Sequence, residues 1–260
     1  MLLDTHDPHP VSVINKESLS PFFMVCDHAG CLIPSQLKTL GLQQSDLCQH
    51  IAWDIGIQKV GEAIAVLIDT TFVAQTYSRL VIDCNRGLNN STLIPEVSDC
   101  VEIIGNLNLT LEQKQARITE IYQPYHQTIS QLIDERLRTN IETVFISLHS
   151  FTPEMKDGFK RPWHAGILHG QDNQFSMVFK KILEEYYAYP IGDNQPYALS
   201  PKNDYTVPTH AYQKKLPYLE LEIRQDLITT ADQQQEWADR LSLLLPLALQ
   251  EYRAYAVNNW

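Results

Sequence analysis

Apolar runs of strand length alternate with stretches of helical periodicity along almost the whole chain. Runs of apolar, β-branched and aromatic residues predict strands over residues 21–30, 71–85 (one or two strands), 143–153, 164–170 and 216–227. Apolar residues at helical spacing predict helices over residues 54–68, 109–139, 174–187 and 233–255. This alternation is typical of an α/β fold, and we expect a three-layer sandwich with a mainly parallel mixed sheet. In such folds ligands bind at the carboxyl ends of the strands.

Length and composition favour one domain spanning residues 1–260. Residues 1–20 are polar, contain proline and show no hydrophobic period, so we expect them to form an amino-terminal extension. Hydrophobic residues make up 44% of the chain, which is enough for a core that needs no disulfide bond. The five cysteines form no CxxC pair, so the sequence indicates neither a disulfide framework nor a thiolate zinc site.

The charge balance excludes two classes of partner. With 31 acidic and 20 basic residues the formal net charge is −11, which opposes binding to nucleic acid or to an anionic membrane surface. The first residues do not combine a basic segment with an apolar one, and no apolar run approaches the ~18 to 20 residues that cross a bilayer. We therefore expect a soluble, cytoplasmic protein.

Polar side chains interrupt the predicted strands or follow them directly. They are Asp27, His28, Asp83, Asn85, Arg86, His149, Ser150, Glu222 and Arg224. Each one alone is more often a structural group with a satisfied partner, because a buried charge needs a counter-charge or a metal ion. Since the carboxyl ends of parallel strands meet at one edge of a sheet, we expect several of them to form a common site.

Two histidines are the preferred metal ligands. His28 and His149 both end apolar strands, and small or hydroxyl residues follow them, which leaves room for a substrate. Two histidines and a carboxylate suit Zn²⁺ or another divalent metal, with a fourth position for a water that the metal activates. Asp54, at a predicted loop-to-helix boundary, is the candidate carboxylate, and capping of the helix is its alternative role.

Strand alternation places Glu222 on the same face as Glu220 and Arg224, opposite the apolar side chains of LELEIRQDL. A half-buried carboxylate beside a metal-bound water is a plausible general base. The alternative is an ordinary ion pair between Glu222 and Arg224 on a solvated strand face.

Arginine and amide side chains near the same strands suit a carboxylate substrate. Arg79, Asn85 and Arg86 in SRLVIDCNR can grip a carboxylate with parallel hydrogen bonds, and the alternatives are phosphate binding or an ion pair with Asp83. His164 and His210 are further pocket candidates.

The cysteines near His28 offer an alternative to metal chemistry. His28 has cysteine neighbours in Cys26 and Cys31, so a thiol hydrolase is an alternative to the metal enzyme. His126, in contrast, lies on a predicted long helix and is expected simply to pack there.

Eight ordered segments carry a family resemblance between Val25 and Trp237. They are HIAWDIG, YSRLVIDCNR, IPEVSDC, IYQPYHQTI, SLHSFTP, RPWHAGIL, IGDNQPY and LEIRQDLI. In these segments the chain resembles the N-formylglutamate amidohydrolase family. The resemblance implies an α/β fold related to the zinc carboxypeptidases and aspartoacylase. It also implies hydrolysis of N-formyl-L-glutamate to formate and glutamate, at the end of histidine breakdown.

The resemblance also suggests roles for residues. Asp83, Asn85 and Arg86 match a pattern similar to the one that holds the substrate carboxylate in aspartoacylase, and Glu222 falls where that wider group places its catalytic glutamate. The chain departs from the wider group at Cys31, since a glutamate is expected three residues after the first histidine ligand. The carboxylate ligand must therefore come from elsewhere.

The resulting hypothesis is a hydrolase in which each candidate residue has a stated role. Glu222 would act as base, Arg79 or His164 would stabilise the oxyanion, and Asn85, Arg86, Arg224 and His210 would contact a substrate with a free carboxylate. The alternatives are a hydrolase of another N-acyl amino acid or small peptide, and a carboxylate-binding protein without turnover.

Overall fold

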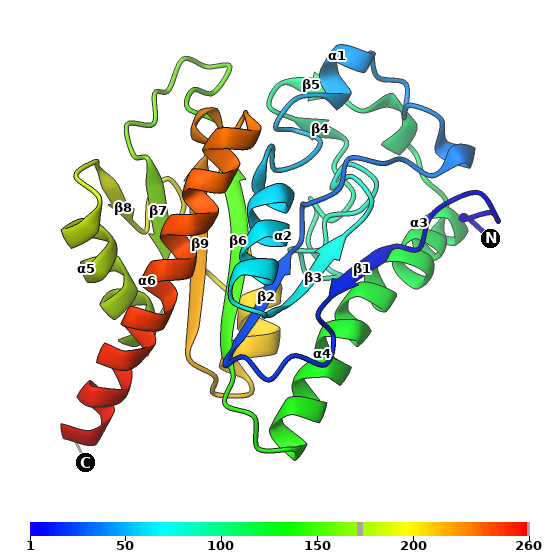
Figure 1. The fold of residues 1–260 in the computed structure, drawn as a ribbon. Coiled ribbons are helices and arrows are strands. Elements are labelled where there is room, and N and C mark those ends of the chain that lie inside the picture. Colours follow the sequence, from blue (N-terminus) through cyan, green and yellow to red (C-terminus); the bar gives the residue numbers. More distant parts are fainter. Residues whose placement is uncertain (171–173, 259–260) are drawn as a thin grey trace.

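A seven-stranded mixed sheet runs through the middle of the molecule (Figure 1). The computed structural model describes residues 1–170 and 174–258. In spatial order the strands are β1 (Val11–Ile14), β3 (Thr71–Gln75), β2 (Phe22–Cys26), β6 (Val144–Phe151), β9 (Tyr218–Arg224), β7 (Ala165–Leu168) and β8 (Ile191–Asp193). Strands β3, β2, β6 and β9 are parallel to one another, while β1 is antiparallel to β3 and β7 is antiparallel to β9. The carboxyl ends of the four parallel strands therefore meet at one edge.

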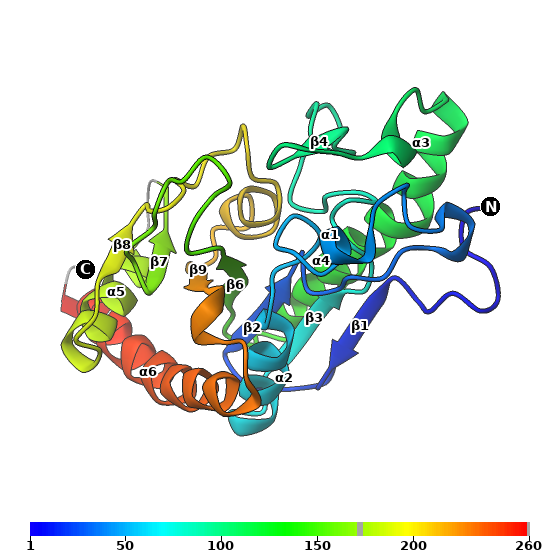
Figure 2. The ribbon, with the colours of Figure 1, turned by 90° about the horizontal axis from the view of Figure 1, so that it is seen from above.

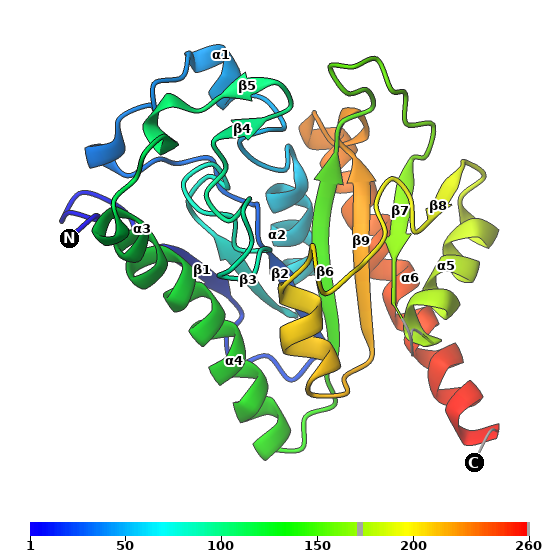
Figure 3. The same ribbon diagram turned by 180° about the vertical axis from the view of Figure 1, so that it is seen from behind.

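Helices cover both faces of this sheet, so the predicted α/β sandwich is confirmed (Figures 2 and 3). One face packs against α2 (Ile57–Leu67), α5 (Gln174–Tyr186) and α6 (Ala231–Asn258). The other face packs against α3 (Leu111–Arg117) and α4 (Gln123–Arg138), which are joined by a π-helical turn, and against a second π-helical turn, Pro208–Tyr212. Each face has its own apolar core cluster.

Period-two alternation on the central strands separates apolar from polar side chains. The side chains of β6 and β9 that join the core beneath α2 and α6 are Val144, Ile146, Leu148, Leu219, Leu221 and Ile223. The intervening residues point to the opposite face. There Ser147 pairs across the strands with Glu220, and His149 pairs with Glu222. Four buried polar residues thus share the sheet face that α4 covers.

Short elements and loops lie over the carboxyl edge of the sheet (Figure 1). They include α1 (Gln44–Leu47), the ribbon of β4 (Val97–Ser98) and β5 (Val101–Glu102), and the 3₁₀ turns Ser35–Leu37, Ile104–Asn106 and Gln225–Leu227. Among the described residues, none of the helices combines the length and apolar character that crossing a bilayer requires.

The structure corrects the prediction in three places. The strand expected over residues 71–85 ends at Gln75, and the apolar residues 80–82 are buried in a loop rather than in the sheet. Strands β1 and β8 were not expected, because each is a short outer strand with partly exposed side chains that give no apolar run. The amino-terminal stretch is tied to the body, since Glu120 accepts the backbone N–H groups of Leu2 and Leu3.

Candidate active site

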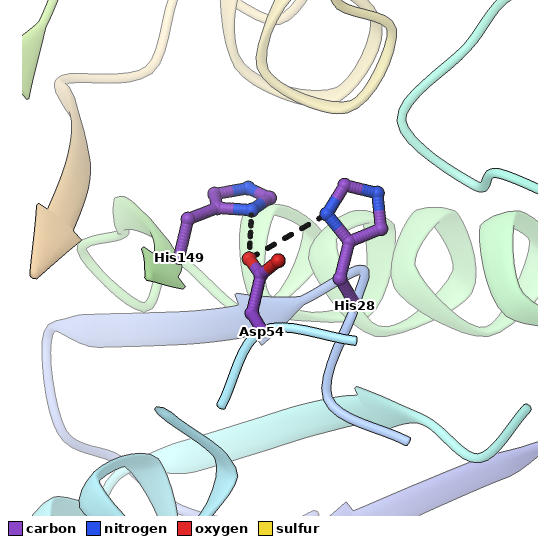
Figure 4. Close-up of side chains that lie close together, drawn as sticks. All are labelled: His28, Asp54 and His149. Carbon is purple, nitrogen blue, oxygen red and sulfur yellow. Dashed lines mark hydrogen bonds and ion pairs between the residues drawn. The ribbon is translucent and has the colours of Figure 1, made fainter. Parts of the chain in front are cut away.

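Three side chains that can bind a metal ion converge at the carboxyl edge of the sheet (Figure 4). His28 follows β2, His149 lies on β6, and Asp54 belongs to the loop before α2. Nδ1 of His149 is 3.0 Å from Oδ2 of Asp54, and Nδ1 of His28 is 3.5 Å from the same oxygen. All three side chains are buried, and their potential ligand atoms lie within 4.8 Å of one another.

The second nitrogen of each ring faces another carboxylate. Nε2 of His28 is 2.7 Å from Oδ1 of Asp83. Nε2 of His149 is 3.1 Å from the Ser147 hydroxyl and 3.4 Å from Oδ2 of Asp27. A histidine that binds a metal through one nitrogen commonly donates its other N–H to a carboxylate, which fixes the tautomer and the ring orientation. Both rings are therefore held so that Nδ1 points toward Asp54.

The electrostatics of this cluster favour added positive charge. Burial lowers the pKa of both histidines, but the nearby aspartates outweigh it and raise the pKa of His28 and, more strongly, that of His149. Burial opposes ionisation of Asp54, yet attraction to the two histidines holds its pKa below the usual value. With neutral rings, two Nδ1 lone pairs would face an ionised carboxylate. A divalent cation among these three donors removes that conflict, so the residues fit such an ion.

Asp54 joins this cluster and does not cap α2. The helix begins at Ile57, and its N-cap is Gly56 with a φ of 82°. A Cβ atom on Gly56 would lie 2.1 Å from the carbonyl oxygen of Ile228, so this tight turn requires glycine. The turn leaves the Asp54 carboxylate free to accept the backbone N–H of Ser150 at 3.2 Å.

Glu222 lies beside the cluster as the cross-strand neighbour of His149. Its side chain is buried, and Oε2 has no hydrogen-bond partner in the part of the chain that the structure describes. Burial raises the pKa of Glu222 to about 7 despite the attraction of His149, and the charge of Asp54 adds to the rise. The alternative ion pair with Arg224 is absent between these two residues, because Arg224 pairs instead with Asp226 at 2.8 Å.

A cavity of about 310 Å³ adjoins the cluster, and Arg79 and Arg86 both line it. Arg79 donates from Nη2 to Asp83 at 2.7 Å, so the ion pair considered for this segment is formed by Arg79. Arg86 lies with Nη1 3.9 Å from Oδ1 of Asp204, and it also donates from Nη1 to the carbonyl of Asn203.

Asn85 lines the same cavity but is engaged in holding a loop. Its Oδ1 accepts the backbone N–H groups of Tyr205 and Thr206 at 2.9 and 3.0 Å. Its Nδ2 is 3.4 Å from Asp204. Asn85 thus connects the cavity wall to the loop that carries Asp204.

Comparison of the sequence with protein families decides the class of the protein. A family model described as N-formylglutamate amidohydrolase matches residues 20–229. The chain belongs to the N-formylglutamate amidohydrolase family. Members are amidohydrolases, so this chain is an enzyme of that type. Comparison with curated proteins gave no significant match.

Solved structures share the fold of this amidohydrolase. The crystal structure of a gene product from Agrobacterium tumefaciens is similar with 31% identity and a TM-score of 0.93, over 97% of this chain and 100% of that one. The crystal structure of N-formylglutamate amidohydrolase from Ralstonia eutropha JMP134 is similar with 17% identity and a TM-score of 0.70, over 95% and 100% of the two chains. At that identity the second likeness concerns the fold alone.

Three residues expected in the pocket lie elsewhere in the amidohydrolase. His164 precedes β7, where its ring stacks on Tyr189 and its Nδ1 is 2.8 Å from the hydroxyl of Tyr187. His210 is buried against His126, with 3.0 Å between their nitrogens. Neither histidine lines the cavity, because each belongs to an aromatic cluster that sequence alternation does not reveal.

Arg224 is the third residue placed outside the cavity. Beyond its pair with Asp226, Nη1 donates to the carbonyls of Arg161, Pro162 and Trp163 at 3.3 to 3.4 Å. Arg224 is the last residue of β9, and its side chain contacts the loop before β7. Its observed contacts hold that loop.

The cavity also includes residues that the sequence did not single out as site residues. Those with titratable side chains are His50, Tyr197, Asp204 and Glu220. Only Glu220 carried a usable signal, since alternation on LELEIRQDL places it beside Glu222. The other three lie outside helices and strands, where no period predicts the direction of a side chain.

The cysteines near His28 are poorly suited to nucleophilic attack. Cys26 is fully buried, and burial raises its pKa well above the usual value. Burial also raises the pKa of Cys31, whose side chain is exposed rather than turned into the cavity. Both thiols therefore stay protonated at neutral pH, and protonated thiols are weak nucleophiles.

Proposed function

We propose that this amidohydrolase uses a divalent metal ion to hydrolyse the amide bond of an N-acyl amino acid, with N-formyl-L-glutamate as the leading substrate. The convergence of His28, His149 and Asp54 beside Glu222, at the floor of one cavity, supports this proposal most directly. His28 and His149 would bind Zn²⁺ or a similar ion through Nδ1, and Asp54 through Oδ2. When bound, such an ion polarises the amide carbonyl and activates a water molecule.

Glu222 is the proposed general base. It is rigid because it lies on a central strand, and its Oε2 has no hydrogen-bond partner among the described side chains. A carboxylate placed in this way accepts a proton from the attacking water and passes it to the nitrogen of the departing amine.

Arg79 and Arg86 have different proposed roles in the reaction. Arg79 is fixed by Asp83 and lies with Nη1 3.6 Å from Asp54, so we assign it to the developing oxyanion. Arg86 bonds to the described residues through Nη1, and its other nitrogens remain for the α-carboxylate of the substrate. Asn85 supports this subsite from the adjoining wall.

Metal removal tests the proposed chemistry. A purified sample treated with a chelator should lose hydrolysis of N-formyl-L-glutamate and regain it on addition of Zn²⁺, because the water depends on the cation for activation. Alkylation of the cysteines should leave the rate unchanged. Activity that survives chelation and disappears on alkylation would reverse the assignment in favour of a thiol enzyme.

The Glu222→Gln variant tests the base. Glutamine keeps the size of the side chain but cannot accept the proton, so kcat should fall by roughly 10² to 10⁴. Metal content, measured by elemental analysis, should equal that of the wild type. A variant with an unaltered rate would assign the base to another residue.

A further inference from the structure

Arg79 and Arg86 line the cavity, Arg161 contacts residues that line it, and the three arginines differ in how their charge is balanced. Arg79 is paired with Asp83 at 2.7 Å, and Arg86 lies 3.9 Å from Asp204. Arg161 is only 6% exposed, and none of the carboxylates in residues 1–170 and 174–258 lies within 4.0 Å of it. Burial of a cation without a counter-ion is unfavourable, so we expect Arg161 to bind an anion from outside the described residues.

The contacts of Arg161 satisfy its guanidinium only in part. Nη1 is 3.5 Å from the carbonyl of Thr152, which is the limit of a hydrogen bond, and Nε has no partner among the described residues. The guanidinium carbon lies 4.8 Å from the ring centroid of Tyr197 and 6.0 Å from that of Phe151. Cation–π contacts offset only part of the cost of removing a charge from water.

The surroundings of Arg161 connect it to the catalytic cavity. Phe151, Thr152 and Tyr197 all line that cavity, and Arg161 contacts each of the three. The loop that carries Arg161 rises over the carboxyl end of β6 (Figure 3). The Arg161 N–H donates to the carbonyl of Pro153 at 2.9 Å, which fixes the backbone next to the strand that bears the proposed metal ligand.

We propose that Arg161, together with Tyr197, forms a second anion subsite that binds the side-chain carboxylate of an N-acyl acidic amino acid. This assignment rests on the proposed function, in which Arg86 holds the α-carboxylate. A guanidinium offers two parallel donors to a carboxylate, and Tyr197 adds a hydroxyl from the same wall. The substrate thus supplies the counter-charge that Arg161 lacks among the described residues, and acidic side chains are selected over neutral ones of equal size.

Two substrates of the same length test this subsite. N-formyl-L-glutamate and N-formyl-L-glutamine differ only in the side-chain carboxylate, so the wild-type enzyme should prefer the former in kcat/KM by roughly 10²-fold. Arg161→Gln should lower kcat/KM for N-formyl-L-glutamate by roughly 10²-fold and that for N-formyl-L-glutamine by less than about threefold. Arg161→Lys keeps the charge but loses the two parallel donors of the guanidinium. Its kcat/KM for N-formyl-L-glutamate should lie between those of the wild type and Arg161→Gln.

Controls separate this proposal from the proposed function. Lys160→Gln removes an exposed charge from the same loop and should leave the substrate ratio unchanged. Equal losses for both substrates in Arg161→Gln, or a wild-type enzyme without preference, would overturn the subsite and leave the amidohydrolase proposal intact. If the metal-loaded wild type hydrolyses neither substrate, the proposed function itself is wrong. Should Arg161→Gln not fold, the wild-type ratio and the Arg161→Lys ratio decide the matter.

Discussion

Two buried histidine pairs lie on the same side of the sheet and have nearly the same spacing. The ring centroids are 5.1 Å apart for His28 and His149 and 5.2 Å apart for His126 and His210. The first pair is surrounded by carboxylates, with Asp54 facing both Nδ1 atoms. The second pair lies among tyrosine rings. Spacing alone therefore does not distinguish a metal site from a packed core.

Hydrogen bonding explains the difference. In the second pair, Nε2 of His126 donates to the carbonyl of Cys84 at 2.9 Å, so its Nδ1 must accept from Nε2 of His210. A donor meets an acceptor, and no ion is needed. Burial lowers the pKa of His126 to about 4 and that of His210 to about 3, whereas the aspartates raise the pKa of His28 and His149. The surroundings of His28 and His149 therefore favour positive charge, whereas those of His126 and His210 oppose it.

Removal of one ring from each pair should separate them most clearly. His149→Ala deletes a proposed ligand, so bound metal should be lost and kcat/KM should fall by roughly 10³ or more. His126→Ala is the matched control, and it should retain metal while losing stability. Elemental analysis after gel filtration, combined with kcat/KM, measures both effects. Equal metal content in the two variants would show that the first pair holds no metal.

The carboxylates behind the first pair should have smaller effects. Asp83→Asn removes the charge that orients His28, so metal affinity should fall by about 10- to 100-fold. Asp27→Asn should cost less, because its oxygen is 3.4 Å from Nε2 of His149 whereas that of Asp83 is 2.7 Å from Nε2 of His28. Competition with a chromophoric chelator gives both affinities. A larger loss in Asp27→Asn would contradict this ranking.

Residues on strands or directly after them were the part of the site that the sequence could predict. His28, His149 and Glu222 end or interrupt apolar runs, and alternation determines which face of the sheet they occupy. Asp54 was predicted only as one of two alternatives, because a carboxylate before a helix is also a common cap. Gly56 occupies the N-cap position and so rules out the capping role, and this is visible only in the folded chain.

Residues on loops could not be predicted in the same way. Arg161 and Tyr197 meet across 36 positions of sequence, and no period connects them. Alternation along the strand predicted that Arg224 would lie in the pocket, but its guanidinium forms an ion pair with the nearby Asp226. The apolar residues 80–82 suggested a strand, whereas their burial comes from a loop packed beneath other loops. Apolar composition indicates that a segment is buried, but only regular alternation of apolar and polar residues indicates a strand.

The smallest expected effect concerns the pH dependence of stability at the second pair. A buried histidine whose pKa falls from 6.5 to about 4 takes up protons more readily in the unfolded state, so stability decreases as pH falls below 6.5 and the loss levels off below about 4. At pH 5 this loss amounts to roughly 2 kcal/mol for His126. His126→Gln keeps an N–H for the carbonyl of Cys84 but cannot be protonated, so the variant should be less stable by about 1 kcal/mol at pH 7.5 and gain on the wild type as the pH falls to 5. Urea unfolding at the two pH values measures this difference, and parallel pH profiles for the two proteins would show that the pKa of His126 is the same in the folded and the unfolded chain.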